Sequence, residues 1–379
     1  MTFEALSWSR WSGIIVKEFI QLKRDRLTFG MVVGIPILQL VLFGFAINSD
    51  PRQLPTAVLD LDHSQYGRSL VQGLRNSGYF RMNHEVGSEA QAEALMSRGE
   101  VQFVITVPPG FARDLVRGQR PVLLVEADAT DPSATGNAIA ALSGVVRTAL
   151  ARDLDGPLAR LNPGPDPVDL RIHRRYNPEA VTAYNIVPGL LGTILTMTMI
   201  LMTGLAMTRE RERGTFENLL ATPALPIEVM TGKIVPYILI GLIQVTLLLL
   251  AALLIFDVPL LGSLLLLYFS VMLFIAANLT LGITFSSIAR NQLQAMQMTF
   301  FFFLPSILLS GFMFPFRGMP QWAQWLGNLL PLTHFLHLVR GIMLKGNGLV
   351  ELWPNIWPIL VFMLASMALG LAVYRKTLD

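Results

Sequence analysis

Hydrophobic residues gather along the chain in six long blocks that polar segments separate. The blocks occupy residues 27–47, 183–207, 234–256, 260–288, 293–314 and 353–374. An α-helix of about twenty apolar residues crosses the hydrocarbon core of a bilayer and pairs its own backbone groups there. The pattern therefore predicts a polytopic α-helical membrane protein with six transmembrane helices. A cleaved signal peptide is the alternative for the first block, but its apolar core would be only about 7 to 15 residues long.

The long polar segment at 48–182 separates the first two blocks and has the pattern of a folded domain. Short apolar runs at 56–60, 101–107 and 122–126 are typical of buried strands. Residues 64–76 and 88–98 show helical patterns between them. A stretch rich in proline and glycine at 155–167 indicates a loop. These signals predict an extracytoplasmic α/β domain inserted between helices 1 and 2.

The segment at 1–26 carries an amphipathic pattern before the first block. Trp8, Trp11, Ile15, Phe19 and Leu22 recur at helical spacing. Tryptophan favours the membrane interface because its ring is buried while its N–H stays hydrated. We therefore expect a helix lying along the cytoplasmic interface. The same pattern also fits a cytosolic helix packed on another subunit.

Composition excludes several classes of protein. The chain has 379 residues, of which 53% are hydrophobic and 15% charged, against about 25% charged residues in an ordinary soluble domain. A purely soluble enzyme is thereby excluded. The absence of cysteine excludes disulfides, thiolate catalysis and cysteine-ligated metal centres. The net charge of +3 comes from basic residues beside the apolar blocks, not from one basic stripe, which argues against nucleic acid as a partner.

The basic residues beside the blocks predict the orientation, because lysine and arginine are retained on the cytoplasmic side of a membrane. They precede the first block, lie between the second and third, follow the fourth and close the chain. Arg317, Arg340 and Lys345, which follow the fifth block, weaken this bias. We therefore expect a multi-pass protein of the bacterial cytoplasmic (inner) membrane, with both termini in the cytoplasm and residues 48–182 outside it.

The loop at 208–233 has the most informative local pattern. Thr215 fits an N-cap, apolar residues after it form one side of a short helix, and Pro223 ends that helix. The spacing alone leaves two interpretations open. The loop is either a rigid helix projecting into the cytoplasm or a capped turn that anchors the membrane ends.

The run from Glu210 to Pro223, ERERGTFENLLATP, resembles the signature ERExGTxExLLxTP of ABC-2-type transporter permeases at every fixed position. The resemblance extends to the six spans, the amphipathic first helix and the large domain after the first span. In that family this loop carries a coupling helix that docks on the nucleotide-binding subunit. The resemblance therefore implies a coupling role for Glu210, Arg211, Glu212, Gly214, Thr215, Glu217, Leu219, Leu220, Thr222 and Pro223.

The resemblance also implies a division of labour. The chain has no phosphate-binding GxxxxGK[ST] sequence, so it is expected to be a permease without its own ATPase site. The implied complex contains two copies of an ABC ATPase subunit, which bind ATP and Mg, and a second permease, identical or related. Together they would move an apolar or amphipathic substrate, drug-like or lipid-like, outward by alternating access. The identity of the substrate and the need for an envelope partner stay open.

Four polar residues inside the blocks are candidates for the substrate path. They are Gln39, Asn185, Gln244 and Asn278. Each of them also fits a hydrogen bond between helices. The blocks contain essentially no ionisable groups, which argues against ion-coupled secondary transport. A receptor or scaffold whose outer domain binds a ligand is the other alternative, but it leaves the signature loop unexplained.

The segment at 315–350 is apolar, but Pro315, Pro320 and Pro331 interrupt it. It therefore cannot form one straight span, and the resemblance implies an outer re-entrant hairpin that forms an exit lid. His334 and His337 lie three positions apart, but no further metal ligands are close in sequence. No metal site is expected there.

A last cluster lies in the α/β segment, where Asp60, Asp62 and His63 follow a predicted strand. Ligands often bind at the carboxyl ends of strands in α/β folds. An ordinary turn explains these residue types better, and no nucleophile and base form a recognisable catalytic pattern. We therefore expect a turn without chemistry.

Overall fold

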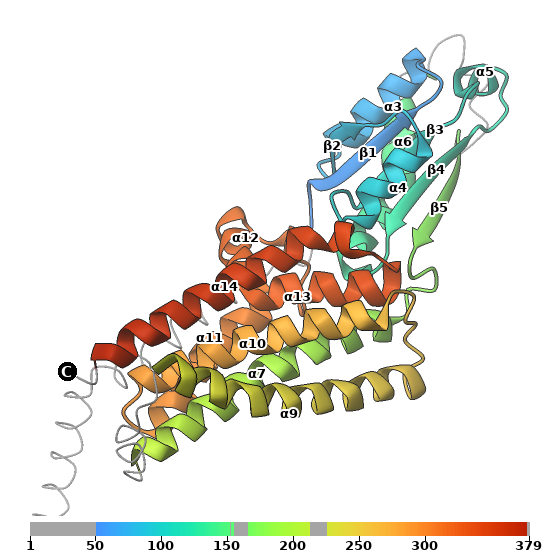
Figure 1. Ribbon diagram of the computed structural model, residues 1–379. Coiled ribbons are helices and arrows are strands. Elements are labelled where there is room, and N and C mark those ends of the chain that lie inside the picture. Colours follow the sequence, from blue (N-terminus) through green and yellow to red (C-terminus); the bar gives the residue numbers. More distant parts are fainter. Residues whose placement is uncertain (1–50, 152, 155–165, 213–225, 377–379) are drawn as a thin grey trace, which may run out of the picture.

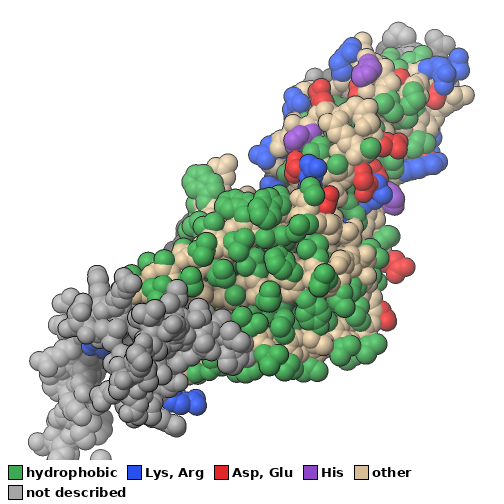
Figure 2. All heavy atoms as spheres, in the orientation of Figure 1, with side chains coloured by type: hydrophobic (Ala, Val, Ile, Leu, Met, Phe, Trp, Pro, Cys, Tyr) green, Lys and Arg blue, Asp and Glu red, His purple; other side chains and the backbone are tan. Residues whose placement is uncertain are grey.

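The computed structural model describes residues 51–151, 153–154, 166–212 and 226–376. These residues form two parts, a sheet domain and a bundle of long helices, which lie end to end (Figure 1). Charged side chains gather on the sheet domain, whereas hydrophobic side chains cover the visible face of the bundle (Figure 2). The predicted interfacial helix at 1–26 and the first apolar block at 27–47 lie outside the described residues.

The sheet domain contains five strands in the order β2-β1-β3-β4-β5. They are β1 (Leu54–Asp60), β2 (Phe80–Glu85), β3 (Phe103–Val107), β4 (Val122–Asp128) and β5 (Asp169–Arg175). Strand β1 is parallel to β2 and β3, β4 is antiparallel to β3, and β5 is parallel to β4. The carboxyl ends of β4 and β5 therefore point towards the bundle, and those of β1 and β3 point away from it (Figure 1).

Helices cover both faces of this sheet. They are α3 (Gln65–Asn76), α4 (Glu89–Ser97), α5 (Phe111–Val116) and α6 (Pro132–Ala151). Apolar residues of α3, α5 and α6 share one core with the strands, and α4 forms a second core on the other face. The helices predicted at 64–76 and 88–98 are confirmed. Ser64 and Ser88 cap them, since each hydroxyl accepts a hydrogen bond from a backbone N–H in the first turn.

Five helices of the described residues are long and apolar enough to cross a membrane. They belong to α7 (Thr182–Glu212), α9 (Pro226–Leu254), α10 (Leu264–Ile288), α11 (Gln292–Leu309) and α14 (Leu349–Lys376). The helix α7 continues five residues beyond its apolar block. The hydrogen bonds of a helix join backbone groups, so they continue through charged residues outside the hydrocarbon. The predicted end of the fifth block at residue 314 is wrong, because Ser310 caps α11 and Gly311 turns the chain with φ +84°.

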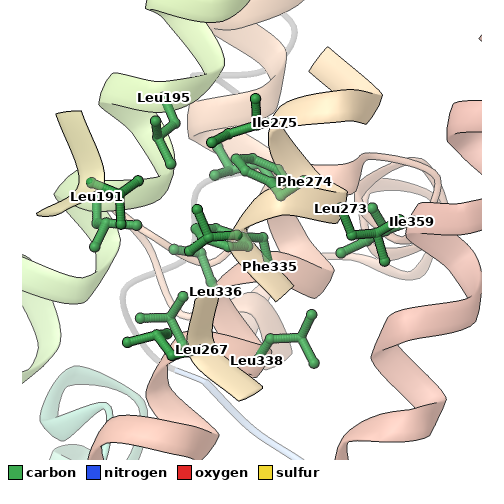
Figure 3. Close-up of a cluster of buried hydrophobic side chains, with 14 of the residues drawn as sticks. Leu191, Leu195, Leu267, Leu273, Phe274, Ile275, Phe335, Leu336, Leu338 and Ile359 are labelled. Atoms are coloured by element: carbon green, nitrogen blue, oxygen red, sulfur yellow. The ribbon is translucent and has the colours of Figure 1, made fainter. Parts of the chain in front are cut away.

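The segment after α11 consists of short helices, which confirms that it is not one straight span. It contains the 3₁₀ turn η3 (Phe316–Gly318), α12 (Gln321–Asn328), α13 (Pro331–Arg340) and the π-helical turn η4 (Gly341–Lys345). The helix α13 packs against α7, α10 and α14. Its Phe335 ring stacks on Phe274 of α10, with 4.0 Å between ring centroids, inside a cluster of buried apolar side chains (Figure 3).

The helices α7 and α10 approach each other closely at a glycine. A Cβ atom added at Gly282 of α10 would lie 1.9 Å from Thr203 Oγ1 and 2.7 Å from the backbone oxygen of Ile200, both on α7. Helices in membranes often associate through such small residues, because the backbones can then pack directly on each other. Gly282 therefore sets the distance between two central helices of the bundle.

Candidate functional site

The signature loop enters the bundle at the end that lies away from the sheet domain, which we call the distal end. The helix α7 ends there at Glu212, and α11 begins there at Gln292. The Glu212 carboxylate accepts a hydrogen bond from the Gln292 backbone N–H, with 2.8 Å between Oε1 and N. Its other oxygen accepts a hydrogen bond from the Gln292 side-chain amide. One carboxylate thus joins the end of α7 to the first residue of α11.

The start of α11 has its own cap beside this contact. The Asn291 side chain accepts a hydrogen bond from the Gln294 backbone N–H at 2.8 Å, and the Gln294 side chain accepts one from the Arg290 backbone N–H at 2.9 Å. Such reciprocal contacts satisfy backbone donors that a helix N-terminus leaves unpaired. Glu212 therefore binds to a helix start that is already well ordered.

The two hydrogen bonds favour the ionised form of the Glu212 carboxyl. The side-chain amide and then the backbone N–H of Gln292 hold the pKa of this carboxyl below its usual value. A group with a lowered pKa contributes its interaction above the ordinary pKa and loses it as the pH falls through the lowered one. The contact is therefore complete at neutral pH, with Glu212 ionised.

Glu212 is the one residue of the predicted coupling set whose side chain the structure describes. Gly214, Thr215, Glu217, Leu219, Leu220, Thr222 and Pro223 lie outside the described residues, and so do the side chains of Glu210 and Arg211. The signature pointed to Glu212, but nothing in the sequence pointed to Gln292. The two residues are 80 positions apart, and a polar glutamine at a helix start is common.

The candidates for the substrate path do not come together. Asn185 at the start of α7 donates to Asp131 of the sheet domain at 3.1 Å, whereas Gln244 of α9 accepts from the Thr198 hydroxyl of α7 at 3.1 Å. Asn278 donates within α10, to the Phe274 backbone oxygen at 2.8 Å. Gln39 lies outside the described residues. The contacts of Asn185 and Gln244 hold different elements together, which is the role that the sequence left open beside substrate contact, whereas the Asn278 contact stays within one helix.

Two basic side chains of α13 contact polar groups of neighbouring segments. His334 of α13 lies 3.1 Å from Asn355 Oδ1 and 2.8 Å from the Asn328 backbone oxygen. Arg340 is 8% exposed, and its terminal nitrogens reach the Gly311 backbone oxygen at 3.4 and 3.5 Å. Within the described ranges, no three His, Cys, Asp or Glu residues gather as a metal site would require.

The acidic cluster at the tip of the sheet domain forms a turn, which confirms that interpretation. Asp60 Oδ1 accepts hydrogen bonds from the backbone N–H groups of Asp62 and His63, at 3.1 and 3.0 Å. The Asp62 carboxylate accepts from Gly110 and Ala112 at 2.9 and 3.0 Å. Asp62 therefore caps α5. Burial raises the pKa of Asp62, but hydrogen bonds from Ser64 and three backbone N–H groups together lower it by more. The pKa of Asp62 therefore lies below its ordinary value.

Removing this cap should loosen α5 alone. Asp62→Ala should cost about 1 kcal/mol locally, which corresponds to roughly fivefold faster amide hydrogen exchange across residues 110–116 in full-length protein. The lowered pKa gives the pH dependence its sign: the contribution is present above pH 4 or so and disappears as the pH falls through the lowered pKa. Asp166→Asn, which removes an exposed ion pair with Arg147, should leave exchange in this region unchanged. Equal exchange in Asp62→Ala and the parent would show that the cap is dispensable.

Comparison with known proteins gives a consistent result over the whole chain. A family model described as "ABC-2 family transporter protein" matches residues 26–372. The chain is 30% identical over 375 residues to the "Probable multidrug ABC transporter permease YbhS" of Escherichia coli, covering 98% of this chain and 97% of that protein. It is 28% identical over 363 residues to the "Probable multidrug ABC transporter permease YbhR" of the same organism, with 96% and 97% covered. It is also 31% identical over 357 residues to the "Inner membrane transport permease YhhJ" of Escherichia coli, with 90% and 93% covered.

Proposed function

Because the chain belongs to the ABC-2 family of transporter proteins, we propose that it is the membrane-spanning subunit of an ATP-driven exporter for an apolar or amphipathic substrate. The relatives are permeases of multidrug ABC transporters and of the bacterial inner membrane. Membership implies an ABC ATPase partner and pairing of two permeases. The observation that carries the mechanism is the contact of Glu212 with Gln292 at the distal end of the bundle.

The proposed orientation places the distal end in the cytoplasm and the sheet domain outside it. The helices α7 and α14 both end at the distal end (Figure 1), and Arg209, Arg375 and Lys376 stand at or near those ends. Basic residues at helix ends mark the cytoplasmic side. In this orientation the signature loop faces the cytoplasm, where an ATPase is available to bind it.

The proposed coupling path begins at that loop. When the ATPase pair closes, it displaces residues 213–225, and the displacement reaches α7 through the continuous chain. It reaches α11 through the Glu212 carboxylate, because two hydrogen bonds fix the α11 N-terminus to the end of α7. The two helices would therefore move together, and their movement would switch the substrate path between inward and outward access. ATP and Mg are bound by the partner subunit.

The proposed path lies among the apolar helices of the bundle. The residues around Phe274 and Phe335 form a closed apolar core (Figure 3), which would become the lining of the path when the helices move apart. An apolar lining accepts amphipathic molecules of many shapes and gives few fixed polar contacts. This supports a drug-like or lipid-like substrate class, with Asn185, Gln244 and Asn278 as candidate polar points along the path.

Inside-out membrane vesicles test the direction and the energy source together. Vesicles from cells that make this chain and its ATPase partner should remove the membrane-soluble dye Hoechst 33342 from the bilayer when ATP is added. An ATPase partner with its P-loop lysine replaced should abolish the effect. Dye movement driven by a proton gradient without ATP would contradict the proposal, as would ATP-dependent movement in right-side-out vesicles only.

A further inference from the structure

A buried ion pair connects the sheet domain to the bundle. Lys345 Nζ lies 2.6 Å from Asp128 Oδ2, and the two side chains are only 8% and 9% exposed. The same ammonium group donates to the Met96 backbone oxygen at 3.1 Å and lies 5.0 Å from the centre of the Tyr176 ring. Lys345 comes from the bundle, whereas Asp128 and Met96 belong to the sheet domain and Tyr176 directly follows its last strand β5.

Both members of the pair lie at the ends of ordered elements. Asp128 is the last residue of β4, and its other oxygen accepts hydrogen bonds from the Thr130 backbone N–H and hydroxyl, at 3.1 and 2.7 Å. Lys345 is the last residue of η4, directly after α13, and Gly346 then turns the chain with φ +70°. A π-helical turn of this kind is uncommon and often marks a functional position. The Asp128 carboxylate is thus held by Thr130, whereas the Lys345 ammonium is held by the sheet domain.

Two further hydrogen bonds cross the same boundary. Asn347 donates to the Ser97 backbone oxygen at 2.8 Å, and Asn185 of α7 donates to Asp131 at 3.1 Å. The bundle thus reaches the sheet domain from two separate elements. The contacts surround Lys345 and Asp128 rather than replace them.

Burial makes this pair different from the exposed ion pairs of the sheet domain. Arg147 and Asp166, for example, are 55% and 45% exposed, and such pairs contribute little because water replaces either partner easily. Separating two buried charges leaves each of them without water and without a partner, which is strongly unfavourable. The Lys345–Asp128 contact therefore resists opening for as long as both groups are charged.

We propose that Lys345 and Asp128 form a rigid joint, so that the sheet domain and α13 move as one body when the bundle changes conformation. This goes beyond the proposed function, which requires no fixed placement of the sheet domain. Its consequence is directional: any movement of α13 is carried into the sheet domain, and a molecule bound to the sheet domain would act back on α13.

Distance measurements between two spin labels test the joint in the full chain without any substrate. The chain has no cysteine, so Arg117→Cys on the sheet domain and Leu349→Cys at the start of α14 provide two unique labelling sites, both exposed. In lipid nanodiscs the parent should give one narrow distance distribution. Lys345→Met should broaden it at least twofold. Arg147→Met, which removes an exposed ion pair, should leave it unchanged.

A double variant separates the joint from simple stability. Lys345→Met alone leaves a buried charge on Asp128, so it also weakens the fold. Combining it with Asp128→Asn removes both charges, which should restore the thermal unfolding midpoint towards that of the parent while the distance distribution stays broad. A distribution as narrow as the parent's in the folded double variant, or in Lys345→Met itself, would overturn the proposal.

Discussion

Glu212→Ala should uncouple ATP hydrolysis from transport in the assembled complex. The substitution removes both hydrogen bonds that join the end of α7 to the start of α11, so displacement of the signature loop would no longer reach α11 directly. ATP-dependent dye transport should fall roughly tenfold, within the range of typical coupling between sites. Basal ATP hydrolysis should continue, because the ATPase subunits themselves are unchanged. Parallel assays of transport and hydrolysis in proteoliposomes measure the two effects.

Two further variants make this result specific. Gln292→Ala removes the side-chain donor but keeps the backbone N–H, so we expect a smaller loss than in Glu212→Ala. Glu100→Ala removes an exposed glutamate of the sheet domain, 3.9 Å from Arg98, and should change neither activity. The coupling assignment is wrong if Glu212→Ala transports dye as well as the parent does, or if transport and hydrolysis fall in the same proportion.

Gly282→Ala should destabilise the whole bundle. The added methyl group would lie too close to the Ile200 backbone oxygen, which cannot rotate away as a side chain can. The helices α7 and α10 would have to move apart, and overpacking of this kind costs about 1–3 kcal/mol. The thermal unfolding midpoint of the purified chain should therefore fall by about 1–4 °C.

Gly136→Ala is the matched control for this prediction. Gly136 lies in α6, and a Cβ atom added there meets nothing within 4 Å. Alanine is preferred over glycine in a helix by about 0.5–1 kcal/mol, so this variant should be as stable as the parent or more so. A melting temperature for Gly282→Ala equal to that of Gly136→Ala would contradict the close packing of α7 on α10.

The strands that could be predicted from the sequence are those buried in the middle of the sheet. β1, β3 and β4 are apolar runs and were expected at nearly their observed positions. The edge strands β2 and β5 are not predicted by the sequence pattern. Along β2 more exposed and less exposed residues alternate, most of β5 is exposed, and both strands contain histidine and arginine. An edge strand has no neighbour on one side, and polar side chains there carry no pattern that separates it from a loop.

Only the signature motif predicts part of the candidate site from the sequence. Glu212 belongs to the signature, whereas its partner Gln292 is determined by tertiary packing. Lys345 and Arg340 gave a misleading signal in the sequence, since they weakened the charge bias used to predict orientation. The structure explains them: Lys345 is buried against Asp128, and Arg340 is buried near the Gly311 backbone oxygen. Both serve contacts within the protein rather than marking a membrane side.

Purification of the tagged full-length chain from its native host in mild detergent tests whether it is the permease of an ATP-driven exporter. Mass spectrometry identifies the co-purifying proteins, and an ATPase assay measures the activity of the eluate. We expect a stoichiometric ABC ATPase subunit, with two copies for each pair of permeases, and ATP hydrolysis that depends on it. Reproducible recovery of the chain without any ATPase, under conditions that keep a known exporter complex intact, would show that this chain is not the permease of an ATP-driven exporter.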